Sequence, residues 1–138
     1  MCCETGPYFA KTLVTMYREF GPDHVLVEPT GVAVPHQVKQ AANMAGRDAK
    51  LSMGPVIVLF DATRPAELLD MDMLGRLVIT QVKDADYIAI SKIDLVDAAG
   101  IAEATQHVKE FNEQAGIFNL SSFTGEGVDR LVEIIEGW

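Results

Sequence analysis

The sequence predicts an α/β fold in which helices flank a parallel β-sheet. Four short apolar runs rich in β-branched and aromatic residues recur along the 138 residues, as strands buried on both faces of a parallel sheet do. Segments of helical period alternate with these runs, which indicates strands joined by helical crossovers. No internal repeat, low-complexity segment or linker divides the chain, so residues 1–138 are expected to form one domain.

The four expected strands each lead into polar residues. They are 24–28 (HVLVE), 55–62 (PVIVLFDA), 86–94 (DYIAISKID) and 116–122 (GIFNLSS). Ligands of open α/β sheets bind beyond the carboxyl ends of the strands. The residues that follow each run are therefore the candidates for chemistry.

Five segments have helical character. Gly21-Pro22 is expected to end the first of them and Gly46 the second. The first places Leu13, Met16, Tyr17 and Phe20 on one face, and the last places Val128, Leu131, Ile134 and Ile135 in one stripe. The five segments are 12–20, 35–47, 68–82, 101–114 and 127–138.

Charge and composition exclude several classes of function. Eleven Lys and Arg against 20 Asp and Glu give a net charge of -9, which disfavours nucleic-acid and anionic membrane partners. A local nucleotide site stays open, because backbone amides and a bound cation hold phosphate inside acidic proteins. The sequence has no apolar run long enough to span a bilayer, and its two cysteines are adjacent, so we expect a reducing cytoplasm.

The third strand ends in Ser91-Lys92-Ile93-Asp94. The Asp94 carboxylate is suited to accept hydrogen bonds from the ring N–H and the exocyclic amine of guanine, which adenine does not offer. The aliphatic stem of Lys92 can lie along the plane of the base. A Ser/Lys/Asp turn is the alternative interpretation.

The fourth strand leads into Ser121-Ser122-Phe-Thr-Gly-Glu-Gly and then a helix. Ser121 and Ser122 are expected to bring loop amides and a hydroxyl near the carbonyl edge of the base. Thr124 is expected as the N-cap of the closing helix, with Glu126 in its first turn. Capping alone would also explain the pattern.

Two further strand ends carry acids. Glu28 is followed three residues later by Gly31; an acid here can hold a metal-bound water, and a glycine lets a backbone N–H approach a phosphate. The alternative is that Glu28 merely caps a loop. Asp61 lies at the end of the second expected strand, and it can also be interpreted as an N-cap or turn residue without a role in binding.

These motifs, in this order, resemble the CobW/HypB/UreG family of GTP-binding metallochaperones. The matching stretches are EPTGVAVP (28–35), VLFDA (58–62), ADYIAISKIDL (85–95) and TGEG (124–127). Pro35 makes the CobW-like branch the most similar, while Ser91 stands where the family usually has Asn. The resemblance implies a P-loop NTPase domain of the SIMIBI type.

The resemblance also implies roles and ligands. Glu28 and Gly31 would sense Mg²⁺ and the terminal phosphate of GTP. Lys92 and Asp94, with Ser91, would recognise guanine in GTP or GDP, and Ser121 with Ser122 would close over the base. The family couples GTP hydrolysis to delivery of a metal to a client enzyme or cofactor pathway.

The sequence departs from the family at its start. It contains no G-x-x-x-x-G-K-[ST] loop, which hydrolysis requires. We therefore expect these residues to be the carboxyl-terminal part of a GTPase domain, without the Walker A strand and loop, and unable to hydrolyse GTP alone. Cys2 and Cys3 match the end of a Cys-x-Cys-Cys metal motif and would form half a site for zinc, cobalt or nickel.

A strand absent from the sheet would leave exposed edges, so we expect either self-association or a rearrangement that closes the gap. Two other functions remain open. One is a metal carrier in which the nucleotide motifs are vestigial. The other is a receiver-like signalling module in which Asp61 accepts a phosphoryl group and Lys92 acts as the switch lysine.

Overall fold

The computed structural model describes residues 5–64 and 73–138. The chain divides into two compact units, Met1–Met53 and Gly54–Trp138. The expected helix at 68–82 lies partly outside the described residues. Among the described residues, no helix is both long enough and apolar enough to cross a membrane.

The second unit contains a parallel sheet of three strands. These are β1 (Ile57–Asp61), β2 (Tyr87–Ser91) and β3 (Gly116–Leu120), in the order β1-β2-β3. Three of the four expected strands are thus confirmed, as is the α/β class. The register pairs Asp61 with Ser91 and Ser91 with Leu120, so all three strands end at the same edge.

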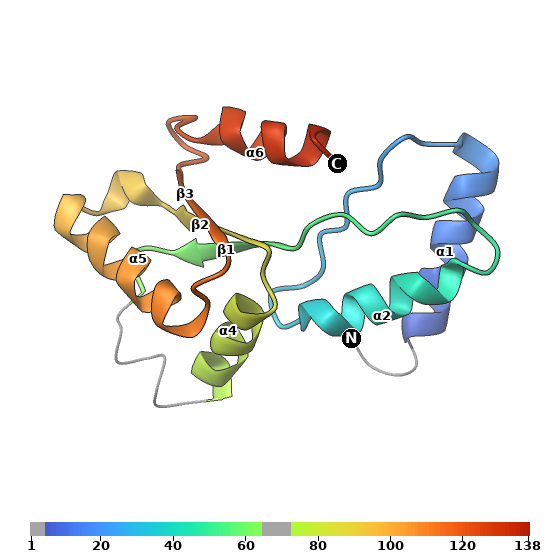
Figure 1. The fold of residues 1–138 in the computed structure, drawn as a ribbon, viewed down its shortest axis with the longest axis horizontal. Coiled ribbons are helices and arrows are strands. Elements are labelled where there is room, and N and C mark those ends of the chain that lie inside the picture. The colour runs from blue at the N-terminus through green and yellow to red at the C-terminus, as the bar shows by residue number, and fades with distance from the viewer. Residues whose placement is uncertain (1–4, 65–72) are drawn as a thin grey trace. The chain divides into compact units, whose positions relative to one another are not determined.

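Helices connect and cover these strands (Figure 1). They are α4 (Met73–Lys83), α5 (Ala98–Phe111) and α6 (Val128–Glu136), with a short 3-10 turn η1 (Ile93–Leu95) directly after β2. In Figure 1, α4 and α5 lie on one side of the sheet and α6 lies on the other. Asp97 caps α5 by accepting from the backbone N–H of Gly100 at 2.9 Å.

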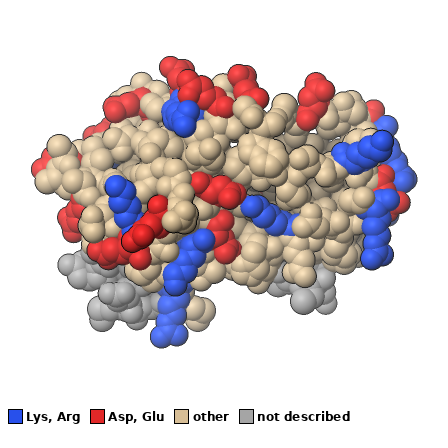
Figure 2. Space-filling model, viewed as in Figure 1, with Lys and Arg blue, Asp and Glu red and all other residues tan. Residues whose placement is uncertain are grey.

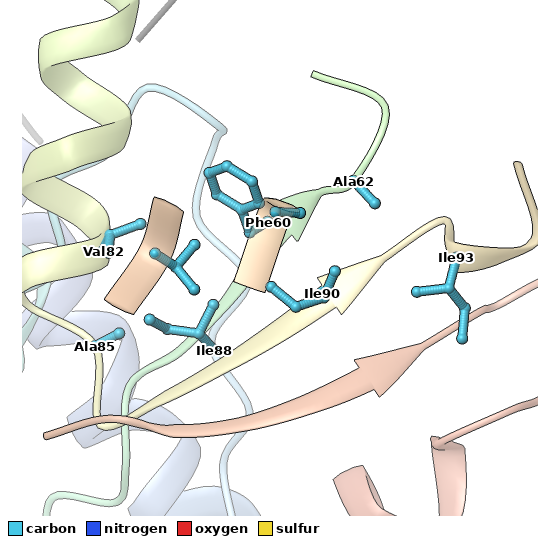
Figure 3. Close-up of a cluster of buried hydrophobic side chains, with 9 residues drawn as sticks. Phe60, Ala62, Val82, Ala85, Ile88, Ile90 and Ile93 are labelled. Atoms are coloured by element: carbon cyan, nitrogen blue, oxygen red, sulfur yellow. The ribbon is translucent and has the colours of Figure 1, made fainter. Parts of the chain in front are cut away.

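The core of this unit lies between β1, β2, α4 and α5. Figure 3 shows Phe60, Ile88 and Ile90 of the strands pointing toward Val82 of α4. Ile88 and Ile90 are fully buried, and burying each such side chain stabilises the fold by about 1.5–3 kcal/mol. This core fixes the strand ends.

Asn112 ties the end of α4 to the turn before β3. Its side-chain amide donates to the carbonyls of Val82 at 2.8 Å and Ala85 at 3.0 Å, and its Oδ1 accepts from the backbone N–H of Gln114 and Ala115 at 3.1 Å each. We predict that Asn112→Ala lowers the free energy of unfolding by about 1–2 kcal/mol, because four hydrogen bonds are lost, three of them partly buried. Urea unfolding followed by circular dichroism measures this, and the exposed neighbour Glu113→Ala is the control. Equal stability of the two variants would contradict the assigned role.

The first unit is a helical pair. α1 (Thr5–Phe20) packs on α2 (Pro35–Ala45) through Ala10, Leu13, Ala42 and Ala45. Gly21 has φ of 53° and its N–H bonds the carbonyl of Tyr17 at 3.2 Å, so the expected end of this helix is confirmed. The expected apolar face is only partly right, since Leu13 is buried whereas Phe20 is 75% exposed.

The expected strand at 24–28 is wrong. Among the described residues of Met1–Met53 the structure has helices and turns but no strand. The sequence has strand character here, but a strand forms only with a hydrogen-bonded neighbour. Without one, Leu26 is 73% and Val27 43% exposed.

Candidate functional site

Polar side chains follow the three strands at the shared carboxyl edge of the sheet. Asp61 is the last residue of β1, Lys92 follows β2, and Ser121 follows β3. Because the strands are parallel and in register, these residues come from neighbouring positions along one edge. Two hydrogen-bonded pairs form there, Asp94 with Ser121 and Asp61 with Lys92.

Ser121 fixes the carboxylate of Asp94. Its hydroxyl is fully buried and donates to Asp94 Oδ1 at 2.5 Å, while accepting from the backbone N–H of Thr124 at 3.1 Å. Asp94 itself lies in η1, where the N–H of Leu95 bonds the carbonyl of Lys92 at 3.0 Å. A charge-assisted hydrogen bond to a buried hydroxyl holds the carboxylate of Asp94 in one orientation. The second oxygen of this carboxylate, Oδ2, is a further hydrogen-bond acceptor.

The loop after Ser121 is closed by its own backbone. Ser121 N–H bonds the carbonyl of Glu126 at 2.9 Å, and Gly125 N–H bonds the carbonyl of Ser121 at 2.9 Å. Gly125 and Gly127 have φ of 84° and 78°, a region that favours glycine. The loop is therefore a compact turn against the Asp94 carboxylate.

The expected cap of α6 is wrong. The N-cap residue is Gly127, and the acid in the first turn is Asp129. Thr124 Oγ1 instead accepts from the N–H of Glu126 at 3.3 Å, within the loop. The two glycines continue the turn past Thr124, so the helix begins later than the capping pattern predicts.

Asp61 and Lys92 form an ion pair that the sequence did not predict. Lys92 Nζ lies 2.6 Å from Asp61 Oδ2. The other oxygen, Oδ1, accepts from the N–H of Thr63 at 2.9 Å and from its hydroxyl at 2.7 Å. The turn role considered for Asp61 is thus confirmed by the Thr63 bonds, and the ion pair is additional. A strand-end acid and a strand-end lysine in neighbouring parallel strands are the signal that could have found it.

The pKa of Asp61 reflects both contacts. Partial burial raises this pKa, but the hydrogen bonds from Lys92 and Thr63 outweigh burial and hold the pKa below its ordinary value of 3.8. A carboxylate with a lowered folded pKa adds stability above the unfolded pKa and loses it as the pH falls through the folded value.

We therefore predict that the stability supplied by Asp61 is present above its ordinary pKa of 3.8 and is lost as the pH falls through its lower folded pKa. As the pH falls from 3.8 through the lower folded pKa, the wild type should lose more unfolding free energy than Asp61→Asn, which has no such carboxylate to protonate. Urea unfolding at several pH values measures the difference. Parallel pH profiles for the two proteins would contradict the prediction.

The other predicted site residues are placed as follows. Ser91 ends β2, and Ser122 is exposed in the loop after β3. Glu28 and Gly31 belong to the first unit, in an exposed segment whose turn is closed by Ala33 N–H on the carbonyl of Thr30 at 2.8 Å. The turn therefore runs from Thr30 to Ala33, and the strand that was expected to present Glu28 does not form.

Cys2 and Cys3, the predicted metal ligands, lie outside the described residues. Within residues 5–64 and 73–138, no group of three or more His, Cys, Asp or Glu side chains is arranged to hold a metal ion. A metal site at the cysteines remains a prediction.

Net charge is confined to the second unit. Residues 54–138 carry 15 acidic and 6 basic side chains, while residues 1–53 carry five of each. Figure 2 shows separate clusters of acidic groups on a visible surface that is mostly uncharged. Lys92 is therefore one of few cations in the unit that holds the Asp94 carboxylate.

A family model described as the nucleotide-binding domain of CobW/HypB/UreG matches residues 1–119. The zinc chaperone CobW of Sinorhizobium sp is 25% identical over 128 residues, which cover 78% of this chain and 36% of that protein. A probable hydrogenase maturation factor HypB of Methanocaldococcus jannaschii is 44% identical over 57 residues, which cover 40% of this chain and 26% of that protein. The chain thus spans about a third or less of these relatives. With most of its length matched by the family model, the chain belongs to the CobW/HypB/UreG family.

Proposed function

We propose that this chain supplies the guanine-recognition part of a GTP-binding metallochaperone. The observation that carries the proposal is the Asp94 carboxylate held by the buried hydroxyl of Ser121 at 2.5 Å. Guanine presents two adjacent N–H donors on one edge, and a fixed carboxylate accepts both. Adenine presents no such pair.

The surrounding residues fit a planar base. Lys92 lies two residues before Asp94 in the chain, and its side chain is 54% exposed, so a ligand can reach its aliphatic stem. The loop that follows Ser121 begins at the hydroxyl that holds the carboxylate, and an amide N–H of this loop would donate to the guanine carbonyl. Ser91 and Ser122 flank these two elements.

Phosphate and Mg²⁺ binding by Glu28 and Gly31 is part of the proposal, by analogy with the family motif. GTP hydrolysis needs a G-x-x-x-x-G-K-[ST] loop, which these 138 residues do not contain. We propose that these residues act as the carboxyl-terminal part of a GTPase domain, and that the chain by itself binds a nucleotide weakly without hydrolysing it.

Metal delivery is proposed for the complete protein. One relative is named a zinc chaperone and the other a hydrogenase maturation factor. Cys2 and Cys3 would contribute two thiolates toward zinc, cobalt or nickel, destined for a client metalloenzyme or cofactor pathway. The adjacent cysteines, which suggest no disulfide framework, support a place in the cytoplasm.

We also propose that the chain associates with other copies of itself. β1 has one neighbour, β2, so its other edge is unpaired within the described sheet. The 24–28 segment forms no strand and exposes Leu26 and Val27. Unpaired edges and exposed apolar strands favour association between chains. Sedimentation velocity over a concentration series tests this, and a monomer at all concentrations would contradict it.

Competition binding tests the central proposal. The probe is a fluorescent GDP analogue with Mg²⁺, displaced by unlabelled GDP or ADP. GDP should displace the probe at concentrations at least about tenfold lower than ADP, because only guanine satisfies both Asp94 oxygens. Equal displacement by both nucleotides, or no probe binding, would refute guanine recognition.

One observation also fits a receiver-like signalling module. The 2.6 Å contact of Lys92 with Asp61 is what a switch lysine and a phosphoacceptor acid would make. Receivers additionally need an acidic pair that holds Mg²⁺ next to the phosphoacceptor acid. Among the described residues, no three or more His, Cys, Asp or Glu side chains are grouped so that they could hold a metal ion. Incubation with acetyl phosphate followed by intact-mass measurement separates the functions, since only a receiver gains a phosphoryl group.

A further inference from the structure

We propose that Asp61 is a positioning residue for guanine recognition, acting by anchoring the side chain of Lys92. This inference rests on the proposed function. Asp61 need not touch the nucleotide; it would act only through Lys92. Neither the sequence motif nor the family match assigns it this role.

The two oxygens of Asp61 have separate tasks. Oδ1 is held by the N–H and hydroxyl of Thr63 at 2.9 and 2.7 Å, while Oδ2 pairs with Lys92 Nζ at 2.6 Å. Thr63 therefore fixes the carboxylate so that its second oxygen points at the ammonium. The Asp61 side chain is 30% exposed, against 54% for Lys92, so the less exposed partner is the anchor.

The backbone conformation of Lys92 is one that needs stabilising contacts. Its backbone lies in the left-handed region, with φ of 60° and ψ of 34°, and it is the only described non-glycine residue with positive φ. Such a conformation is unfavourable for a side chain with a Cβ and persists where surrounding contacts enforce it. The Asp61 pair and the bond of Leu95 N–H to the Lys92 carbonyl are two such contacts.

The anchor also restricts a flexible side chain. A free lysine samples many rotamers, and ordering its stem over a base costs conformational entropy. With Nζ held at Asp61, the stem between Cα and Nζ is fixed before the base arrives. Lys92 then links the end of β1 to η1, the turn that carries Asp94.

The net charge of the second unit and the anchoring role of Asp61 predict opposite changes in nucleotide affinity when the Asp61 charge is removed. The second unit carries 15 acids and 6 bases, so removing any one carboxylate should slightly favour an anionic nucleotide. Anchoring predicts the opposite for Asp61: removing its charge should weaken nucleotide binding. The direction of the change in nucleotide affinity therefore distinguishes anchoring of Lys92 from a general effect of charge.

The test compares Asp61→Asn with Glu133→Gln for binding of GDP. The asparagine side chain keeps an oxygen for Thr63 but presents no second acceptor to Lys92, so only the anchor is lost. Glu133→Gln breaks another exposed ion pair of the same unit, 2.9 Å from Arg130. We expect the Kd for GDP to rise about five- to tenfold in Asp61→Asn and to stay equal or fall in the control.

A double-mutant cycle with Lys92→Met shows whether the effect passes through Lys92. Methionine keeps an apolar stem without the ammonium, so Asp61→Asn should cause no further rise in Kd in that background. A general structural fault at Asp61 would instead weaken both backgrounds equally. Equal weakening in both backgrounds, or an unchanged Kd for Asp61→Asn, would overturn the anchoring role of Asp61. Neither result would contradict guanine recognition, as long as the wild type binds GDP. Wild-type protein that does not prefer GDP over ADP would instead overturn the proposed function, and this inference with it.

Discussion

Replacing Asp94 by asparagine is expected to exchange guanine for xanthine as the preferred base. Asparagine presents one acceptor and one donor where the carboxylate presents two acceptors. Xanthine carries a carbonyl where guanine carries the exocyclic amine, so the new donor meets an acceptor. We expect the Kd for GDP to rise at least about tenfold and xanthosine diphosphate to become the tighter ligand.

Competition binding with GDP, xanthosine diphosphate and ADP measures this exchange. Ser121 can still pair with the Oδ1 of the new amide, so the loop should keep its closure. Asp129→Asn, which changes an exposed acid in the first turn of α6, is the matched control and should keep the preference for GDP. Equal loss of all three nucleotides in Asp94→Asn would show that Asp94 supports the fold rather than reading the base.

Gly127→Ala is expected to have the largest effect on stability. A Cβ at Gly127 would overlap the carbonyl oxygen of Asn119, and the φ of Gly127 is 78°. Both the clash and the left-handed backbone act against a side chain. We expect the free energy of unfolding to fall by about 3 kcal/mol or more, because β3 and the Ser121 loop cannot both keep their positions.

Gly125→Ala provides a matched control. Its φ of 84° is similar, but a Cβ there meets nothing within 4 Å, so only the backbone cost of about 1 kcal/mol applies. Urea unfolding of both variants isolates the clash as the difference between them. If both variants lost the same stability, the approach of Asn119 to Gly127 would not be a constraint of the fold.

The sequence predicted much of the second unit because its signals are local. Continuous apolar runs identify β1 and β2, and Ile88 and Ile90 of β2 are fully buried. The segment 24–28 has the same local signal and yet forms no strand. Strand formation depends on a neighbour, which composition and periodicity do not report.

The candidate site was predicted in its residues but not in its contacts. Asp94, Lys92 and Ser121 follow from strand-end motifs, whereas the Asp61–Lys92 pair joins residues 31 positions apart. A pairing of that kind depends on the strand order and register. Thr124 shows the limit of local patterns: it fits a capping rule, but two left-handed glycines move the helix start to Val128.

The most direct test of guanine recognition is a ¹H–¹⁵N NMR titration of the wild type with GDP and, separately, ADP. GDP should shift the amide signals of Lys92, Asp94 and the 121–127 loop in a saturable manner, because these backbone groups surround the proposed site of the base. ADP at the same concentrations should leave those signals in place. Shifts of equal size with both nucleotides, or shifts confined to residues away from this edge of the sheet, would contradict the account.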